Sequence, residues 1–416
     1  MSSYLHGVED IPLVDRNDLY RLTTFVPNKT IPVHSWYPYL QGFSSKLVKI
    51  LLDEIKPTEA DTILDPFNGV GTTVLTSRDI GVKSVGFDIS PLAVMVARGK
   101  MVQCVDNEKC LDELTRLNKI ELADNVLPNH GIVAKGLTSE TANKIVQVRD
   151  SISEIEDENI RMVLQSALIS TIGEVSFVKK DGAHYRFIDK PKSESFEEAF
   201  EAKVRKFLHD LDMNASLIAD NTWEVQCCDA RSLPLEDSSI SAVITSPPYL
   251  NRNNYIAQNK LELFMMECVK EMADYRKLTH STLRSHVEAR FDSKTQFKHP
   301  LVDAHIEQIE ARLDSNAKNN KKIPEMVGGY FDDMYMVIRE LSRVMKKDSL
   351  CFFVVGNSAW EGVYIEVDRI LSDIFIECGF KVEEIRVTRL KNNSAQQIKK
   401  FGKIKIRESI IVARRY

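Results

Sequence analysis

Apolar residues recur along the chain with two spacings, one typical of helices and one typical of buried strands. Leu47, Ile50, Leu51 and Ile55 have helical spacing and predict a helix over 44–56, with serines available as caps. Beyond it, short apolar runs alternate with helical patterns. The predicted strands lie at the start of TILDPFNGVGTT (62–73), in KSVGFDIS (83–90) and over 223–229, 240–245, 349–355, 381–390 and 405–414; the predicted helices cover 72–79, 91–100, 331–346 and 362–378.

This alternation of strands and helices predicts an α/β protein with a mostly parallel sheet covered on both faces. The last two strands have no predicted helix between them, so we expect them to form an antiparallel hairpin at the end of the sheet. Two polar, largely helical stretches interrupt the alternation. We therefore assign residues 30–100, 221–250 and 330–416 to one core, 101–220 to a helical insertion and 251–329 to a second, basic helical insertion.

Length and composition narrow the class of protein. A chain of 416 residues is too long for one ordinary domain. No apolar run approaches the roughly 20 residues of a membrane helix, and the N-terminus lacks the basic and apolar regions of a signal peptide. The seven cysteines are scattered without the spacing of metal ligands, so we expect a reduced, cytoplasmic protein with no metal site.

The net charge of −5 is unusual for a protein that binds nucleic acid, but the charge is unevenly distributed. Residues 381–416 contain eleven Lys and Arg against Glu383, Glu384 and Glu408. Phosphate binding requires a local basic face and not a basic total. The alternative is that this stretch is an ordinary solvated surface.

The first motif with chemical meaning is DPFNGVGTT (65–73), where a predicted strand turns into a helix. Its glycines let the backbone approach a ligand, and Asp65 is placed to meet a cationic or amino group. Asp88 ends the next strand about twenty residues later, the spacing at which an acid accepts hydrogen bonds from ribose hydroxyls. The third glycine of a pyrophosphate fingerprint is missing. The motif therefore favours a nucleoside cofactor without a pyrophosphate over NAD.

The second motif is Ser246-Pro247-Pro248-Tyr249, directly after the predicted strand over 240–245. Two prolines remove two N–H donors and stiffen the chain, while their carbonyls and the serine hydroxyl remain as acceptors. An aromatic ring follows at once. Such a loop suits a planar group with an NH₂; the alternative is a stiff loop with a buried tyrosine.

Together, DPFNGVGTT and TSPPY resemble the cofactor and catalytic loops of the DNA amino-methyltransferases of restriction-modification systems, which make N6-methyladenine or N4-methylcytosine. HSWYPYLQGFSSKLV (34–48), CCDAR (227–231) and RESIIVARR (407–415) resemble further parts of that family. The resemblance does not reach the two irregular stretches. Here the cofactor motif precedes the catalytic motif, whereas other family members reverse that order.

The resemblance implies a Rossmann-like methyltransferase fold with a seven-stranded sheet, S-adenosylmethionine as cofactor and double-stranded DNA as substrate, with a possible partner endonuclease. Asp88 would bind the ribose, and Asp229 would lie near the adenine amino group. The residues implied in cofactor binding are Phe43, Ser44, Asp65, Pro66, Phe67, Gly69, Gly71, Thr72, Asp88 and Asp229; those implied in binding the target base are Ser246, Pro247, Pro248 and Tyr249.

These residue types suit methylation of an exocyclic amine, whose lone pair is delocalised into the base. Acceptors at Ser246 and the Pro247 carbonyl can bind the amine protons and favour a pyramidal nitrogen for in-line transfer. The base must leave the duplex, and Tyr249 can stack on it. Methylation at C5 of cytosine would instead need a cysteine nucleophile, and the sequence has no Pro-Cys dipeptide.

Serine at the first position of the loop goes mostly with N4 of cytosine in the family, so Ser246 favours cytosine. N6 of adenine is the alternative. Two further readings are an RNA base-amine methyltransferase, which usually has Asn-Pro-Pro-Tyr and an RNA-binding domain, and a non-catalytic partner that keeps only the fold. The second would be expected to lack the acids or the Pro-Pro-aromatic sequence, and all of these are present.

Base recognition in a groove requires Arg, Lys, Asn or Gln. We expect it in 251–329, which follows the catalytic loop directly. This part of the chain offers Asn251, Arg252, Asn253, Asn254, Arg276, Lys277, Arg284, Arg290, Lys294 and Lys298, together with His280, His286, His299 and His305, which lack ligand-pair spacing. The alternative in the first insertion consists of Lys179, Lys180, His184, Tyr185 and Arg186.

Overall fold

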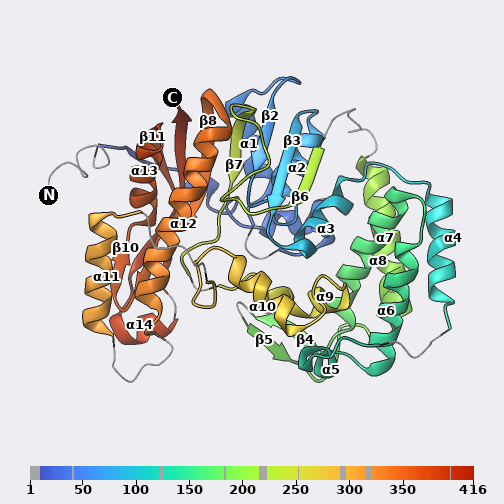
Figure 1. The fold of residues 1–416 in the computed structure, drawn as a ribbon. Helices are drawn as coiled ribbons and strands as arrows, with labels where there is room; N and C mark the ends of the chain where they lie inside the picture. The colour runs from blue at the N-terminus through green and yellow to red at the C-terminus, as the bar shows by residue number, and fades with distance from the viewer. Residues whose placement is uncertain are drawn as a thin grey trace.

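The computed structural model describes residues 10–39, 42–121, 126–181, 184–214, 223–251, 253–290, 297–313, 320–393 and 395–416. Within them, an eight-stranded sheet has the order β1-β11-β12-β8-β7-β2-β3-β6 (Figure 1). Its strands are β1 (Leu13–Asp15), β2 (Thr62–Asp65), β3 (Lys83–Asp88), β6 (Trp223–Cys227), β7 (Ile240–Thr245), β8 (Met345–Gly356), β11 (Phe380–Asn392) and β12 (Lys405–Arg415).

The expected Rossmann-like, mostly parallel sheet is confirmed. Strands β8, β7, β2, β3 and β6 are parallel to one another, and β12 is antiparallel to both β8 and β11. The seven expected strands are joined by an eighth, β1, which pairs with β11.

The last two strands, β11 and β12, differ from the prediction in two ways. Strand β12 lies inside the sheet between β8 and β11, and the connection from β11 contains a short helix, α14 (Ala395–Phe401), where no helix was expected. The sequence AQQIKKF consists mostly of good helix formers, which explains the helix.

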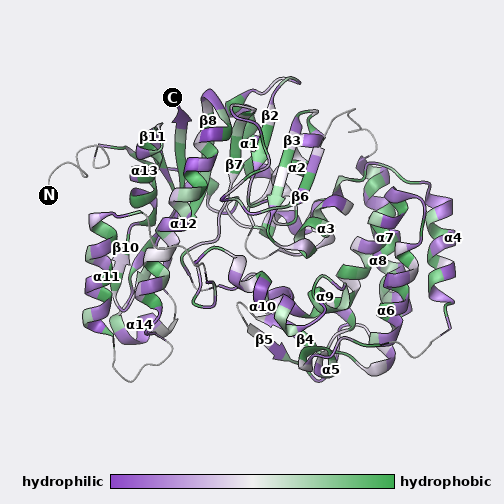
Figure 2. Ribbon diagram, viewed as in Figure 1, coloured by the Kyte–Doolittle hydropathy of each residue, from purple (hydrophilic) through white to green (hydrophobic). Residues whose placement is uncertain are grey.

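Helices cover both faces of the sheet because successive strand residues point to opposite sides. On β2, Ile63 packs with α1 (Ser45–Ile55), whereas Leu64 belongs to the buried cluster of α12 (Ile323–Val344) and α13 (Val367–Glu377). Helices α2 (Thr72–Asp79) and α3 (Pro91–Met101) follow α1 on the same face of the sheet, since α1 contacts α2 and α2 contacts α3. Hydrophobic residues are concentrated along the central strands, while the outer helices alternate hydrophobic and hydrophilic residues (Figure 2).

A group of helices lies beside the sheet and shares a core with it (Figure 1). It consists of α4 (Asn107–Asn118), α5 (Gly131–Gly136), α6 (Ser139–Ser153), α7 (Glu158–Val175) and α8 (Phe196–Asn214), with a hairpin of β4 (Val178–Asp181) and β5 (His184–Phe187). Helix α7 packs on α3 so closely that a Cβ on Gly99 would lie 1.9 Å from the Ser166 hydroxyl oxygen. This contact requires glycine.

The helices between 251 and 329 pack in two places. The short 3₁₀ turn Ala257–Asn259 leads into α9 (Lys260–Met265), which contacts α5, α6 and α7, whereas α11 (Pro300–Arg312) packs against α12. Helix α10 (Met272–Ser281) lies near α9 in Figure 1.

Two predicted helices begin elsewhere than expected. Helix α12 begins at Ile323 because Pro324 occupies its first turn, and α13 begins only at Val367 because β10 (Val363–Ile365) pairs with β9 (Ser358–Trp360). None of the described helices has the length and apolarity needed to cross a membrane.

Candidate functional site

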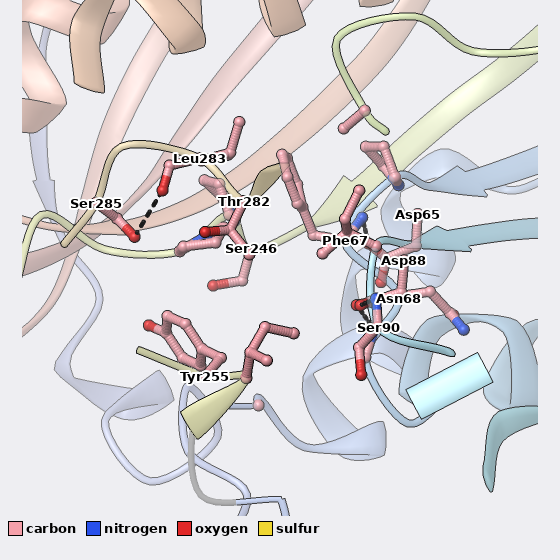
Figure 3. Close-up of a pocket in the computed structure, with 18 of the residues that line it drawn as sticks. Asp65, Phe67, Asn68, Asp88, Ser90, Ser246, Tyr255, Thr282, Leu283 and Ser285 are labelled. Atoms are coloured by element: carbon pink, nitrogen blue, oxygen red, sulfur yellow. Dashed lines mark hydrogen bonds between the residues drawn. The ribbon is translucent and has the colours of Figure 1, made fainter. Parts of the chain in front are cut away.

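A cavity with about 1130 Å³ of empty space, part of it open to solvent, lies where the parallel strands end. The DPFNGVGTT loop, the Ser-Pro-Pro-Tyr loop and the segment 281–286 form its walls. Figure 3 shows Ser246 between Phe67, Asp65 and Asp88 on one side and Thr282 and Leu283 on the other. The carboxyl ends of parallel strands are the usual place for a ligand in such a sheet.

The structure brings most of the predicted residues together around this cavity. Of the fourteen, those that line it are Phe43, Asp65, Pro66, Phe67, Gly69, Thr72, Asp88, Asp229, Ser246, Pro247, Pro248 and Tyr249. Gly71 and Ser44 do not line it. Gly71 has a φ of 86° before α2 and a Cβ there would lie 3.2 Å from the Cβ of Ala97, while the buried Ser44 caps α1 by accepting from the Leu47 N–H.

Asp65 connects the two loops of the site. One carboxylate oxygen accepts from the Thr245 hydroxyl at 2.6 Å and the Phe67 N–H at 3.1 Å, and the other accepts from the Thr73 hydroxyl at 2.7 Å. The side chain is buried, and burial raises the pKa of Asp65 to about 6 although these hydrogen bonds favour the charged form. Its partners are hydroxyls and a backbone N–H of the chain itself.

Asp88 fixes the cofactor loop from the end of β3. Its two oxygens accept from the Gly69 N–H and the Ser90 N–H, both at 2.8 Å. Each oxygen makes one such bond and retains acceptor capacity at the cavity wall. Burial raises the pKa of Asp88, and the two N–H donors oppose that rise. Gly69 has a φ of 50°, and a Cβ there would lie 2.9 Å from the Tyr39 ring.

Asp229 is the half-buried end of a series of charged side chains that leads into the protein. Arg231 lies 2.6 Å from a carboxylate oxygen of Asp229 and 3.2 Å from one of Asp333, and it donates to the Ser281 carbonyl at 2.7 Å. Arg284 lies 2.7 Å from the same Asp333 oxygen. This series therefore connects the end of β6 to the segment 281–286 that walls the cavity.

Ser246 and Tyr249 are positioned by the strands beside them. The Ser246 hydroxyl donates to the Val354 carbonyl at 3.1 Å, which leaves its oxygen lone pairs as acceptors. The Tyr249 ring lies against Gly356, where a Cβ would approach it to 2.9 Å, and the Lys391 ammonium lies 5.3 Å from the ring centroid. Burial raises the pKa of Tyr249 and lowers that of Lys391.

Apart from His286, which was among the candidates in 251–329, sequence reasoning missed the residues of the wall opposite the cofactor loop. The Tyr255 hydroxyl accepts from the Tyr249 N–H at 3.4 Å, and Asn259 lies beside it in the wall. In the segment 281–286, Thr282 and His286 contact each other at 2.9 Å, and the other ring nitrogen of His286 lies 3.1 Å from Glu288. The signal in the sequence was that this part of the chain follows the catalytic loop directly, and of the wall residues in 281–286 it identified only His286.

The other candidate residues for recognition are dispersed. His299 lies 3.0 Å from Asp373, His305 is half-buried, and no group of metal-ligating side chains occurs among the described residues. Asn254 is buried and donates to Glu288. Among the recognition candidates of 251–329, the exposed residues are Arg276, Lys277, Arg290 and Lys298, whereas Asn251, Asn253 and His280 are half-buried. Arg252, Lys294 and the side chain of His184 lie outside the described residues.

Most arginines of the basic C-terminal stretch form ion pairs within the protein. The pairs are Arg386 with Glu54 and Glu384, Arg389 with Glu408, Arg407 with Glu366 and Asp368, and Arg414 with Glu383. Lys381, Lys399, Lys403 and Lys405 are exposed. Much of this charge therefore stabilises the sheet, which the sequence count did not indicate.

With this geometry, the sheet and the cavity at its carboxyl edge define a Rossmann-like methyltransferase fold. The chain is 29% identical to the Type II methyltransferase M.BsoBI of Geobacillus stearothermophilus, over 98% of this chain and 90% of that protein. It is 28% identical to M.AvaI of Nostoc sp., over 95% and 89%, and 22% identical to M.MvaI of Kocuria varians, over 82% and 80%. The similarity to Type II methyltransferases thus extends beyond the motifs to nearly the whole chain.

No family model matches the chain. Among solved structures, a SAM-dependent methyltransferase of Methanosarcina mazei aligns with 88% of this chain and 96% of its own at 10% identity and a TM-score of 0.31, too low a score to add to the description of the sheet.

Proposed function

We propose that the protein is a DNA methyltransferase, the modification enzyme of a restriction-modification system, which transfers a methyl group from S-adenosylmethionine to N4 of a cytosine that has left the duplex. The observation that supports this best is the shared cavity. Asp65 and Asp88 of one motif and Ser246 and Tyr249 of the other line the same space. The extended similarity to Type II methyltransferases agrees with this function.

The cavity suits a positively charged nucleoside cofactor. Asp65, Asp88 and Asp229 line it, and no Lys or Arg is among the described residues of its wall. Acidic walls repel the phosphates of a dinucleotide and favour a sulfonium with an ammonium group. Asp88 would bind the ribose hydroxyls, Asp229 would lie near the adenine amino group, and Phe67 would provide an apolar surface. S-adenosylmethionine, when bound, supplies the electrophilic methyl group.

The Ser-Pro-Pro-Tyr loop would hold the target amine. The Ser246 hydroxyl donates to Val354, so its free acceptor orbitals can take one amine proton while the Pro247 carbonyl takes the other. Binding both protons draws the nitrogen lone pair out of conjugation, which favours in-line transfer. The Tyr249 ring would stack on the base, supported from behind by Gly356. Methyl transfer leaves the amine positively charged, and it would then release one of these two protons to water.

Cytosine N4 is favoured over adenine N6 by the serine at position 246, on the family resemblance. Methylation at C5 requires a thiolate. The cysteine among the described wall residues, Cys228, contacts backbone carbonyls on the Asp229 side, and burial raises the pKa of its thiol. We place target recognition in 251–329, because Ser281, Thr282 and Leu283 of that stretch wall the cavity.

The deciding experiment is single-turnover methylation of a duplex by the full chain, with mass spectrometry to locate the methyl group. We expect N4-methylcytosine, a large loss of rate in Ser246→Ala, and retained cofactor binding in that variant. Methyl groups on adenine N6 would change the target base but not the mechanism. Transfer only to structured RNA, or to cytosine C5, would contradict the proposal.

A further inference from the structure

The β4–β5 hairpin presents two cations next to each other on one face. Its register pairs Lys179 with Arg186 and Lys180 with Tyr185. Because side chains alternate along a strand, these two pairs lie on opposite faces of the hairpin. Lys179 and Arg186 are exposed, and neither forms an ion pair with any residue that the structure describes.

The opposite face of the hairpin is fastened to the wall of the cavity. The Lys180 ammonium lies 2.6 Å from Glu262 and donates to the Asn259 side-chain oxygen at 2.7 Å. The Tyr185 hydroxyl accepts from the Lys260 N–H. Asn259 lines the cavity, and this segment follows the Ser-Pro-Pro-Tyr loop directly. The two exposed cations are therefore held at a fixed place close to the site.

We propose that Lys179 and Arg186 together bind a phosphate of the DNA backbone near the nucleotide that enters the cavity. Like charges directly opposite each other in a hairpin repel, with Cβ atoms about 5 Å apart. A phosphate between them would replace this repulsion with two charge-assisted bonds. Backbone phosphates fix the register of a protein on DNA, as extraction of one base requires.

The inference rests on the proposed function, because it takes duplex DNA as the partner. It assigns the hairpin a positioning role and leaves base recognition to other residues. It also differs from the expectation that the basic stretch 381–416 supplies the phosphate contacts, since four of the arginines there are already paired with carboxylates.

The test measures duplex affinity against salt concentration for the full chain and for Lys179→Ala combined with Arg186→Ala. The plot of log affinity against log salt should become less steep by about 1 to 2, the change expected for one or two lost phosphate contacts. The KM for the duplex should rise with the loss of affinity. The charge-conserving exchange Lys179→Arg with Arg186→Lys should restore most of the slope.

Lys83→Ala combined with Lys347→Ala is the matched control, since both lysines are exposed near the amino ends of β3 and β8, at the far edge of the sheet. This control should keep the wild-type slope. If the hairpin variant keeps the wild-type slope, or the control loses as much, the inference is wrong even though the enzyme methylates DNA. A wild-type protein that neither binds nor methylates duplex DNA would contradict the proposed function itself.

Discussion

The Thr245 hydroxyl donates a 2.6 Å hydrogen bond to Asp65. Asp65 ends β2 and Thr245 ends β7, so this bond joins the two strand ends that lead into the cofactor loop and the Ser-Pro-Pro-Tyr loop. Thr73 donates to the other Asp65 oxygen at 2.7 Å. A single buried carboxylate therefore sets the distance between the two halves of the proposed site.

Thr245→Val should test this link, because valine keeps the shape of threonine but removes the donor. We expect the free energy of unfolding to fall by about 1–3 kcal/mol, the cost of leaving a buried acceptor short of a partner. Methyl transfer should slow more than cofactor affinity weakens. Urea unfolding and single-turnover kinetics measure the two effects. Thr245→Ser keeps the hydroxyl and should behave like the wild type; an unaltered rate in Thr245→Val would count against the link.

The stability of the protein should depend on the protonation of Asp65. Burial raises its pKa to about 6 from an ordinary value of 3.8, so the folded state binds this proton more tightly than the unfolded state. The contribution of Asp65 is fully present below the unfolded pKa and is lost as the pH rises through about 6.

Asp65→Asn removes this titration. The unfolding free energy of the wild type minus that of the variant should therefore increase as the pH falls through about 6 toward 3.8. Urea unfolding at a series of pH values measures it. Asp61→Asn, on a half-buried acid whose pKa is lowered by hydrogen bonds from Thr58, should show the opposite trend. A constant difference for Asp65→Asn would show that its carboxylate does not titrate in this range.

Asp88→Asn should weaken binding of S-adenosylhomocysteine by about 1–3 kcal/mol, because the amide offers one acceptor oxygen where the carboxylate offers two. Calorimetry measures this directly without DNA. Glu59→Gln, a surface change outside the cavity wall, serves as the control. Equal affinities in wild type and Asp88→Asn would remove Asp88 from the cofactor site.

Gly356→Ala should displace the Tyr249 ring, because the new methyl group would lie 2.9 Å from it. We expect slower methyl transfer and weaker DNA binding, with unchanged affinity for the cofactor. Gly173→Ala is the control: it lies within α7 with no atom within 4 Å of the new methyl, and it should raise stability by about 1 kcal/mol. If Gly356→Ala methylates DNA as fast as Gly173→Ala does, the position of the Tyr249 ring does not depend on its contact with Gly356.

The loops that line the cavity could be predicted because each is encoded locally. A strand, a glycine turn and a helix follow one another in 62–79, and a strand runs directly into Ser246. The opposite wall could not be predicted, because Arg284 is held by Asp332 and Asp333, 48 and 49 residues later in the chain. Such contacts depend on the completed fold and leave no periodic pattern.

Two structural features that were not predicted correctly do have a recognisable signal in the sequence. Strands β4 and β5 were not predicted, although Asp-Gly, which stands at 181–182 in the sequence, is a common hairpin-turn dipeptide. Pro324 marked the true start of α12. The internal ion pairs of the C-terminal arginines had no such signal, because their partners include Glu54, Glu366 and Asp368 from other parts of the chain.

The interior position of β12 has a consequence for biosynthesis. Strands β8 and β11 pair with β12 and not with each other, so neither can complete its hydrogen bonding until residues 405–415 have left the ribosome. Until then the nascent sheet presents two open edges. The β8 edge is apolar from Leu350 to Val355, so it invites pairing with other chains. Removal of these residues by a protease would recreate that state in the finished protein, and its product would be expected to aggregate.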